Sequence, residues 1–202
     1  SLKNITERYD GYGNSIRRVM EQKKREAGIL GVVADIISVD AKYEIAVETA
    51  LGGSIQNIVT VDEETAKRMI GYLKKNKFGR ATFLPLTSVK SSPFSRPEVL
   101  EEEGVIGLAH TLVKTEKKFE ELAGNLLGRT VVVDNIDTGI RLARKYRQSI
   151  RMVTPEGELL NPGGSMTGGA FKNAGNLLGR RREIEELEKK VQLLKKDMDE
   201  ME

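Results

Sequence analysis

Two stretches of the chain carry apolar residues at alternating intervals of three and four, with mostly charged or polar residues between them. In the C-terminal stretch these positions are Ile184, Leu187, Val191, Leu194, Met198 and Met201. In the N-terminal stretch they are Leu2, Ile5, Tyr9, Tyr12, Ile16 and Val19. This spacing is the a/d heptad of a coiled-coil seam. It predicts two helical arms, and we expect the chain to be the central piece of a longer protein whose arms continue beyond it.

Between the arms the pattern nearly repeats itself at a constant offset. The matching segments are 28–31 with 104–107, 42–44 with 118–120, and 51–52 with 127–128. Matches that preserve residue character at one offset indicate two homologous subdomains. We therefore predict an N-terminal arm at 1–26, subdomain I at 27–86, a linker at 87–103, subdomain II at 104–175 and a C-terminal arm at 176–202.

Each subdomain begins with the same predicted elements. An apolar run comes first in each, at 32–39 and at 105–113. The helices that follow have apolar stripes at Tyr43, Ala46, Val47, Ala50 and Leu51, and at Phe119, Leu122, Ala123, Leu126 and Leu127. Gly52 and Gly128 stand where a helix C-cap favours a left-handed residue.

The second part of each subdomain also follows one order. Strands are predicted at 55–61 and 130–133, followed by Asp62 and Asp134 as helix N-caps. The second helices bury Ala66, Met69, Ile70 and Leu73, and Ile140, Ala143 and Tyr146. Short strands at 80–84 and 150–154 close the units. The alternation predicts an α/β fold with helices packed on small sheets.

Composition excludes several kinds of site. The chain has no Cys and one His, which removes thiol nucleophiles, disulfides, zinc fingers and nearly all transition-metal sites. His110 is interpreted as structural or solvated, and no catalytic residue or metal site is predicted. No apolar run is long enough to span a membrane, so we expect a soluble intracellular protein.

A glycine-rich segment at 161–170 has no counterpart in the first half. A Walker phosphate loop needs Lys and Ser or Thr after its last glycine, but Gly169 and Ala170 follow here. The alternatives are an ordinary flexible loop and a surface where two main chains approach closely, because glycine lacks Cβ. The paired glycines favour a dimer interface formed by Gly163, Gly164, Ser165, Met166, Thr167, Gly168 and Gly169.

Basic residues cluster where the arms join the core. With 33 basic and 30 acidic residues the net charge is only +3, so nucleic-acid binding depends on local patches. The clusters are Arg17, Arg18, Lys23, Lys24 and Arg25 in the first arm, and Arg180, Arg181 and Arg182 in the second. We expect the two arm roots to lie together and to grip DNA phosphates without reading sequence.

Taken together, the coiled-coil roots, the duplicated core and the glycine segment resemble the hinge domain of SMC (structural maintenance of chromosomes) proteins. The motifs closest to bacterial and archaeal members lie at 31–37, 39–40, 42–44, 50–52, 79–86 and 163–169. The zinc hook of related repair ATPases is excluded because it requires Cys.

The resemblance implies a non-enzymatic homodimerisation hinge. The opposite subdomains of two copies would pair into a ring, with the glycines at the interface and the two arms of each chain folded as an antiparallel coiled coil. ATP, magnesium and accessory subunits would bind at distant heads, with no cofactor in this fragment, in a cytoplasmic, nucleoid-associated protein.

Some bacterial members carry a lysine run after the glycine motif. Here it is reduced to Lys172, so DNA contact would depend more on the arginines. A stand-alone DNA-binding module and a phosphate-binding enzyme remain the alternatives.

Overall fold

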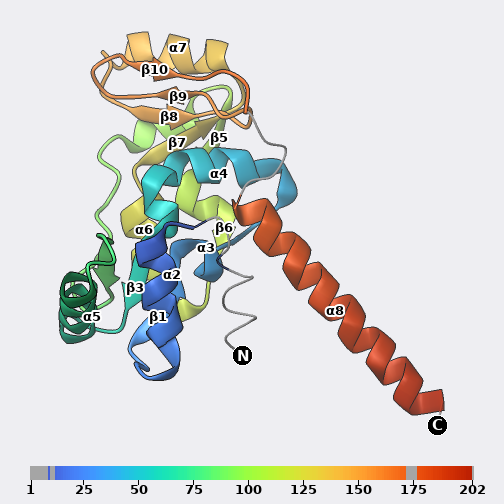
Figure 1. Ribbon diagram of the computed structural model, residues 1–202. Helices are drawn as coiled ribbons and strands as arrows, with labels where there is room; N and C mark the ends of the chain where they lie inside the picture. The colour runs from blue at the N-terminus through green and yellow to red at the C-terminus, as the bar shows by residue number, and fades with distance from the viewer. Residues whose placement is uncertain (1–8, 10–11, 172–176, 202) are drawn as a thin grey trace.

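Two sheets with helices packed against them form the body of the molecule (Figure 1). The computed structural model describes residue 9 and residues 12–171 and 177–201. In the first sheet, β1 runs antiparallel to the central strand β3, and β4 runs parallel to it. These strands are β1 (Ile29–Val32), β3 (Ile58–Thr60) and β4 (Phe83–Pro85).

The second sheet repeats this arrangement and extends it. β5 is antiparallel to β7 and β8 is parallel to it, and β9 and β10 add two further antiparallel strands. Both β1 and β5 have a register shift at the same place, before Gly31 and Gly107. The strands are β5 (Val105–Leu108), β7 (Thr130–Val133), β8 (Arg151–Val153), β9 (Leu159–Leu160) and β10 (Met166–Thr167). The predicted α/β class with small sheets is confirmed, and the shared topology agrees with two homologous subdomains.

A two-stranded sheet connects the halves, because β2 (Ser38–Val39) pairs with β6 (Val113–Lys114). Neither of the apolar runs at 32–39 and 105–113 forms a single element. A short helix, α3 (Val33–Ile36), interrupts the first run, and the 3-10 helix η5 (Ala109–Leu112) interrupts the second. Val33, Ala34 and Ala109 are buried, and an apolar run buried on all sides has no periodicity that separates strand from helix.

The first long helix of each half lies at the centre of the molecule, where α4 and α6 contact one another. The predicted stripes are confirmed, with Tyr43 and Leu126 half-buried and the others buried. Gly52 has φ +55, but Gly128 is right-handed, so its predicted left-handed cap is wrong. A Cβ at Gly128 would lie 2.3 Å from the Gly124 carbonyl oxygen, so close packing explains this glycine. The elements are η2 (Ala41–Tyr43), α4 (Glu44–Leu51), η3 (Gly52–Gln56), η6 (Lys117–Phe119) and α6 (Glu120–Leu127). Because η3 extends to Gln56, the strand predicted at 55–61 is shorter than expected.

The second helices, α5 (Glu63–Asn76) and α7 (Ile136–Lys145), pack against their sheets. The Asp62 cap is confirmed, because its Oδ1 accepts from the Thr65 amide at 2.9 Å. The Asp134 cap is wrong by one residue: Asn135 Oδ1 accepts from the Thr138 amide at 2.9 Å. Ile70 was expected to be buried but is 52% exposed, since the buried side of α5 runs through Thr65, Ala66, Met69 and Leu73.

One hydrophobic cluster extends through both halves, and a smaller one lies between α7 and the second sheet. β7 separates the two clusters: Val132 belongs to the large one, and Val131 and Val133 to the small one. The halves therefore share a core and do not form independent globules.

The N-terminal helix α2 (Asn14–Glu21) belongs to this core. Tyr12, Ile16 and Val19, expected in a coiled-coil seam, lie in the large cluster, as does Tyr9. Leu2 and Ile5 lie outside the described residues. A short 3-10 helix, η1 (Gln22–Lys24), leads from α2 into β1.

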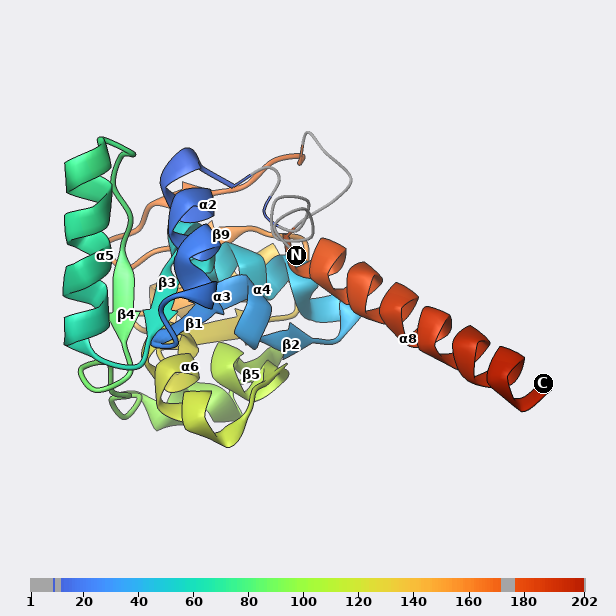
Figure 2. The ribbon, with the colours of Figure 1, turned by 60° about the horizontal axis from the view of Figure 1, so that its bottom comes forward.

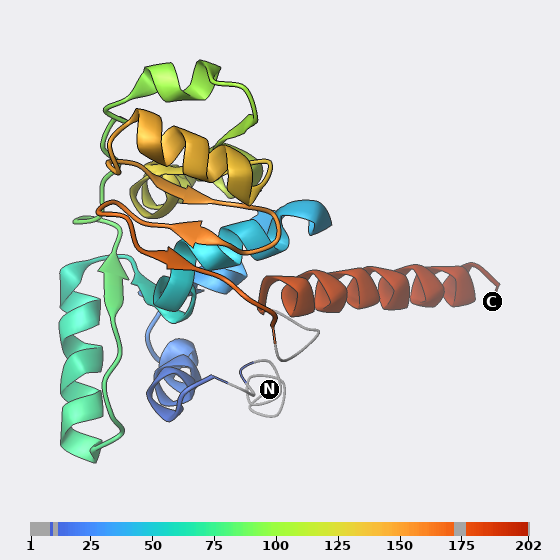
Figure 3. The ribbon, with the colours of Figure 1, turned by 90° about the horizontal axis from the view of Figure 1, so that it is seen from above.

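The C-terminal helix α8 (Leu177–Met201) projects from the body in all three ribbon views (Figure 1, Figure 2 and Figure 3). Its first turns contact α3, α4 and β2. Further along, the predicted seam residues Leu187, Val191, Leu194, Met198 and Met201 are exposed, while Ile184 is half-buried. Among the described helices, none is long and apolar enough to cross a membrane.

The linker is anchored to the second half. Val99, in the 3-10 helix η4 (Pro97–Glu101), is fully buried. Next to it, Glu102 pairs with Lys145 and accepts from the Tyr146 hydroxyl at 2.8 Å. The linker, which was expected to be exposed, is therefore anchored at its C-terminal end by a buried residue.

Candidate dimer interface and arm root

The glycine-rich segment forms the edge of the five-stranded sheet. β10 pairs only with β9, which leaves its outer edge without a strand partner in the described chain. Residues 163–171 are all exposed, including the large side chains of Met166 (50%) and Phe171 (62%). An exposed edge strand with apolar side chains is a template for pairing with another chain.

The glycines give this edge a specific backbone. Gly163, Gly164 and Gly169 have φ of +92°, +106° and +129°, which other residues adopt at a cost. A Cβ at Gly163 or Gly169 would meet no atom of this chain within 4 Å. Their conformation, and not packing within the chain, therefore requires glycine, and the space beside the main chain stays open.

Hydrogen bonds hold the loop that leads into β10. The amide of Gly163 donates to the Gln148 carbonyl at 2.8 Å, and that of Gly164 donates to the Asn161 carbonyl at 3.0 Å. These amides face protein acceptors, so they are not free to cradle a phosphate. The arrangement favours an ordered interface over a flexible loop or a nucleotide site.

A second feature is the root of α8, which acidic residues of the first half hold in place. Glu48 Oε1 accepts from the Leu177 amide at 3.2 Å and so caps the helix from a distant segment. Burial raises the pKa of Glu48, while its bonds to the Leu177 and Leu178 amides oppose the shift. Arg182 donates to Glu44, which is only 5% exposed.

Asp35 completes this root. Its Oδ1 lies 3.9 Å from Nε of Arg181, and its Oδ2 accepts from the Tyr9 hydroxyl. Asp35 thus contacts both the N-terminal segment and α8. The expected meeting of the two arm roots agrees with this shared contact.

The predicted DNA-binding residues fall into two groups. Arg181 and Arg182 are paired with carboxylates, and Arg18 lies 3.7 Å from Glu21 and stacks over Phe78. Lys23, Lys24, Arg25 and Arg180 are exposed, and Arg17 is half-buried. Lys172 lies outside the described residues. The patch at the root of α8 is therefore less positive than its sequence suggests.

Sequence reasoning missed the acidic partners Asp35, Glu44 and Glu48. A signal was present, since Glu44 and Glu48 lie one helical turn apart in a largely apolar helix. For a metal, the described residues offer no group of three or more His, Cys, Asp or Glu. His110 is half-buried at the surface of η5.

Comparison with known proteins identifies this architecture. The family model for "SMC proteins Flexible Hinge Domain" matches residues 26–143. The chain belongs to the SMC hinge family. It is 38% identical over 203 residues to the chromosome partition protein Smc of Halothermothrix orenii, covering 98% of this chain and 17% of that protein. The Smc of Bacillus subtilis is 40% identical over 187 residues, covering 91% of this chain and 16% of that protein.

Solved hinge structures have the same fold. The SMC hinge domain of Geobacillus stearothermophilus, crystallised as an asymmetric dimer, superposes with a TM-score of 0.85 at 35% identity, covering 98% of this chain and 81% of that one. The Pyrococcus furiosus SMC hinge gives 0.66 at 36% identity, covering 87% and 90%. The matches are to the hinge domain of SMC proteins, the module that the sequence resemblance implied.

Proposed function

We propose that this hinge joins two copies of a chromosome partition protein into a homodimer. The observation that carries the proposal is the free edge of β10, flanked by glycines whose backbone conformation leaves room for a second main chain. Strand addition at such an edge gives main-chain hydrogen bonds, and Met166 and Phe171 add apolar contact area. The dimer described for the Geobacillus stearothermophilus hinge supports the proposal.

In this dimer, β10 of one copy pairs with a free edge of the first sheet of the other. β1 and β4 are the two edges of that sheet. Each copy has one β10 edge and one first sheet, so two equivalent contacts close a ring with two-fold symmetry.

The hinge works mechanically. α8 is the rigid start of one arm, and its exposed heptad seam binds the other arm of the same chain in an antiparallel coiled coil. The chain spans 17% of its Halothermothrix orenii relative, so ATP and magnesium binding, accessory subunits and the cytoplasmic, nucleoid-associated location belong to the proposed whole protein. The hinge itself uses no cofactor.

DNA binding at the arm roots is a secondary part of the proposal. The exposed residues Lys23, Lys24, Arg25 and Arg180 supply most of it, with Arg17 and Lys172. Because Arg181 and Arg182 are already paired, binding is weak, independent of sequence and sensitive to salt.

The test of dimerisation is the mass in solution of Gly164→Glu and Gly168→Glu, measured by light scattering. We expect a dimer for the parent chain and a monomer for each variant, because the new side chains occupy the space between the main chains. Gly71→Glu is the control for an added exposed carboxylate, since a Cβ there meets no atom within 4 Å and Gly71 lies on the exposed side of α5. Folded variants that stay dimeric would show that β10 is not the interface.

A further inference from the structure

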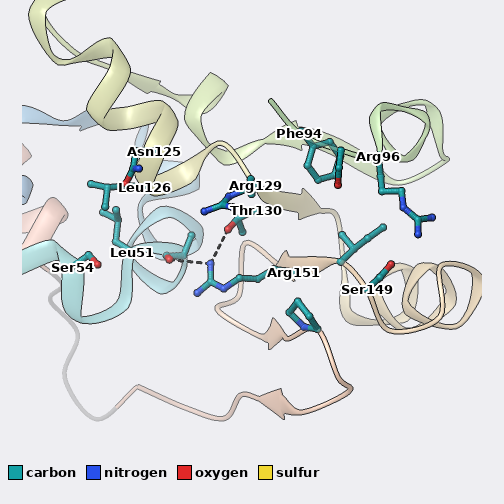
Figure 4. Close-up of a pocket in the computed structure, with 14 residues that line it drawn as sticks. Leu51, Ser54, Phe94, Arg96, Asn125, Leu126, Arg129, Thr130, Ser149 and Arg151 are labelled. Carbon is teal, nitrogen blue, oxygen red and sulfur yellow. Dashed lines mark hydrogen bonds between the residues drawn. The ribbon is translucent and has the colours of Figure 1, made fainter. Parts of the chain in front are cut away.

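A cavity of about 490 Å³ lies between the two halves, where the linker passes both of them (Figure 4). The end of α4 contributes Ala50, Leu51 and nearby Ser54, and the linker contributes Phe94 to Arg96. The second half contributes the starts of β7 and β8. Three distant segments thus line one partly open space, of a volume typical of small-ligand sites.

The charges that line the cavity have one sign. Arg96, Arg129 and Arg151 are among its lining residues, and no Asp or Glu is. Within the described residues, none of these three arginines makes an ion pair. Other arginines of this chain, such as Arg68 and Arg182, do have carboxylate partners. The cavity therefore concentrates positive charge that the fold does not neutralise.

Arg151 is held ready for a ligand. Its Nη1 donates to the Ala50 carbonyl at 3.0 Å and to Thr130 Oγ1 at 2.7 Å, which fixes the guanidinium and leaves its other N–H groups available. Burial lowers the pKa of Arg151, although the group stays charged. A cation that is immobilised and poorly solvated loses little more on binding an anion.

The other polar groups suit an oxyanion. Figure 4 shows Arg129 and Arg151 beside Thr130, with Arg96 and Ser149 toward the other side of the cavity. Ser54 and Asn125 also line it and can donate hydrogen bonds. Two guanidinium groups with hydroxyl and amide donors match a phosphate better than a carboxylate, which offers only two oxygens.

We propose that this cavity binds the phosphate group of a small phosphorylated ligand, with Arg129 and Arg151 as direct ligands and Arg96 at the rim. This site is separate from the glycine loop, where the Gly163 and Gly164 amides are already bonded, and from the basic clusters at the arm roots. Pro162 lines the cavity and directly precedes Gly163, so a bound ligand lies next to the proposed dimer surface.

The test is calorimetric titration of the dimeric hinge with inorganic phosphate and with pyrophosphate. We expect saturable binding to the parent chain, and a loss of affinity of about tenfold or more in Arg129→Met, since a charge-assisted contact is removed. Unlike Arg151, Arg129 makes no side-chain hydrogen bond to the described residues, so this variant should fold normally and remain a dimer. Arg144→Met is the matched control: Arg144 is exposed on α7, outside the cavity, and its loss should leave binding unchanged.

Three results would overturn the proposal. The first is no saturable binding of either anion at millimolar concentration. The second is an equal loss of affinity in Arg129→Met and Arg144→Met, which would indicate nonspecific charge attraction. The third is arginine-dependent binding of a DNA oligonucleotide in the absence of any binding of the small phosphates, which would make the cavity a nucleic-acid contact.

Discussion

The guanidinium of Arg151 donates to the main-chain carbonyl of Ala50 at 3.0 Å, across 101 positions of sequence. Ala50 lies in the last turn of α4, where carbonyls lack helical partners and favour a cation. The same Nη1 also binds Thr130 in β7. Arg151 therefore connects the end of a helix in the first half to two strands of the second.

Arg151→Met should lower the free energy of unfolding by about 1–3 kcal/mol, because it leaves the Ala50 carbonyl and the Thr130 hydroxyl without their charged donor. Urea denaturation measures this change. Arg129→Met, in the same cavity but without such bonds, should change stability by less than about 0.5 kcal/mol. Equal effects of the two substitutions would mean that Arg151 does not connect the halves.

Substitution of Arg182 should lower the free energy of unfolding, whereas substitution of Arg180 should leave it almost unchanged. Arg182→Met leaves the buried carboxylate of Glu44 without this partner and should lower the free energy of unfolding measured by urea denaturation, with the partial exposure of Arg182 limiting the loss. Arg180→Met should leave stability within about 0.5 kcal/mol of the parent, since Arg180 is exposed.

DNA affinity should show the reverse order. Arg180→Met should reduce the slope of affinity against salt by about one phosphate contact, whereas Arg182→Met should change it little. A larger DNA effect from Arg182→Met would contradict its assignment as an anchor of α8.

The sequence predicted well those elements whose burial is one-sided. The stripes of α4 and α6 have a clear helical period, and their buried residues were identified almost completely. The apolar runs 32–39 and 105–113 could not be divided into strand and helix from the sequence, because α3 and η5 are buried within the shared core, where periodicity disappears. The seam at Ile16 and Val19 was misassigned for a related reason: a heptad and a core-facing helix have nearly the same spacing.

The candidate site, like the fold, could be predicted from the sequence only in part. Glycine chemistry located the free edge of β10, because positive φ and open space are local requirements. The pairing of Arg181 and Arg182 with Asp35 and Glu44 depends on how α8 docks across more than a hundred residues, which no local pattern encodes. The cavity around Arg151 also arises only from tertiary assembly.

The N-cap of α7 is Asn135, one residue after the predicted Asp134, and substitutions at the two positions test this difference. Asn135→Ala should destabilise the fold by about 1 kcal/mol, because the Thr138 amide loses its acceptor. Asp134→Ala should cost clearly less, although Asp134 is acidic and equally close to the helix. Thermal denaturation of the two variants side by side measures the difference, and the opposite order would restore Asp134 as the cap.

Stability should fall as the pH drops through the carboxylate range. Hydrogen bonds from Lys145 and Tyr146 lower the pKa of Glu102 below its ordinary value of 4.5. In the same way, a hydrogen bond from Arg68 lowers the pKa of Glu26, and hydrogen bonds from Ser91 lower the pKa of Glu121. Each of these groups binds a proton less readily when folded, so its contribution is complete above the ordinary value and is lost as pH falls through the folded pKa. Glu48 acts in the opposite direction, because its pKa is raised and protonation favours the folded form.

The lowered groups outnumber Glu48, so the melting temperature should decrease as the pH falls from about 5 through the folded pKa values of these carboxylates. Glu102→Gln should be less stable than the parent at neutral pH and should lose less stability on acidification, since the linkage through this carboxylate is removed. Glu156→Gln is the control, as Glu156 is exposed in a turn and makes no ion pair in the described part of the chain. If Glu102→Gln follows the parent curve at every pH, the anchor between the linker and α7 does not contribute to acid sensitivity. The decrease must then come from other carboxylates with lowered pKa values, which are Glu26, Glu121, Asp62 and Glu63.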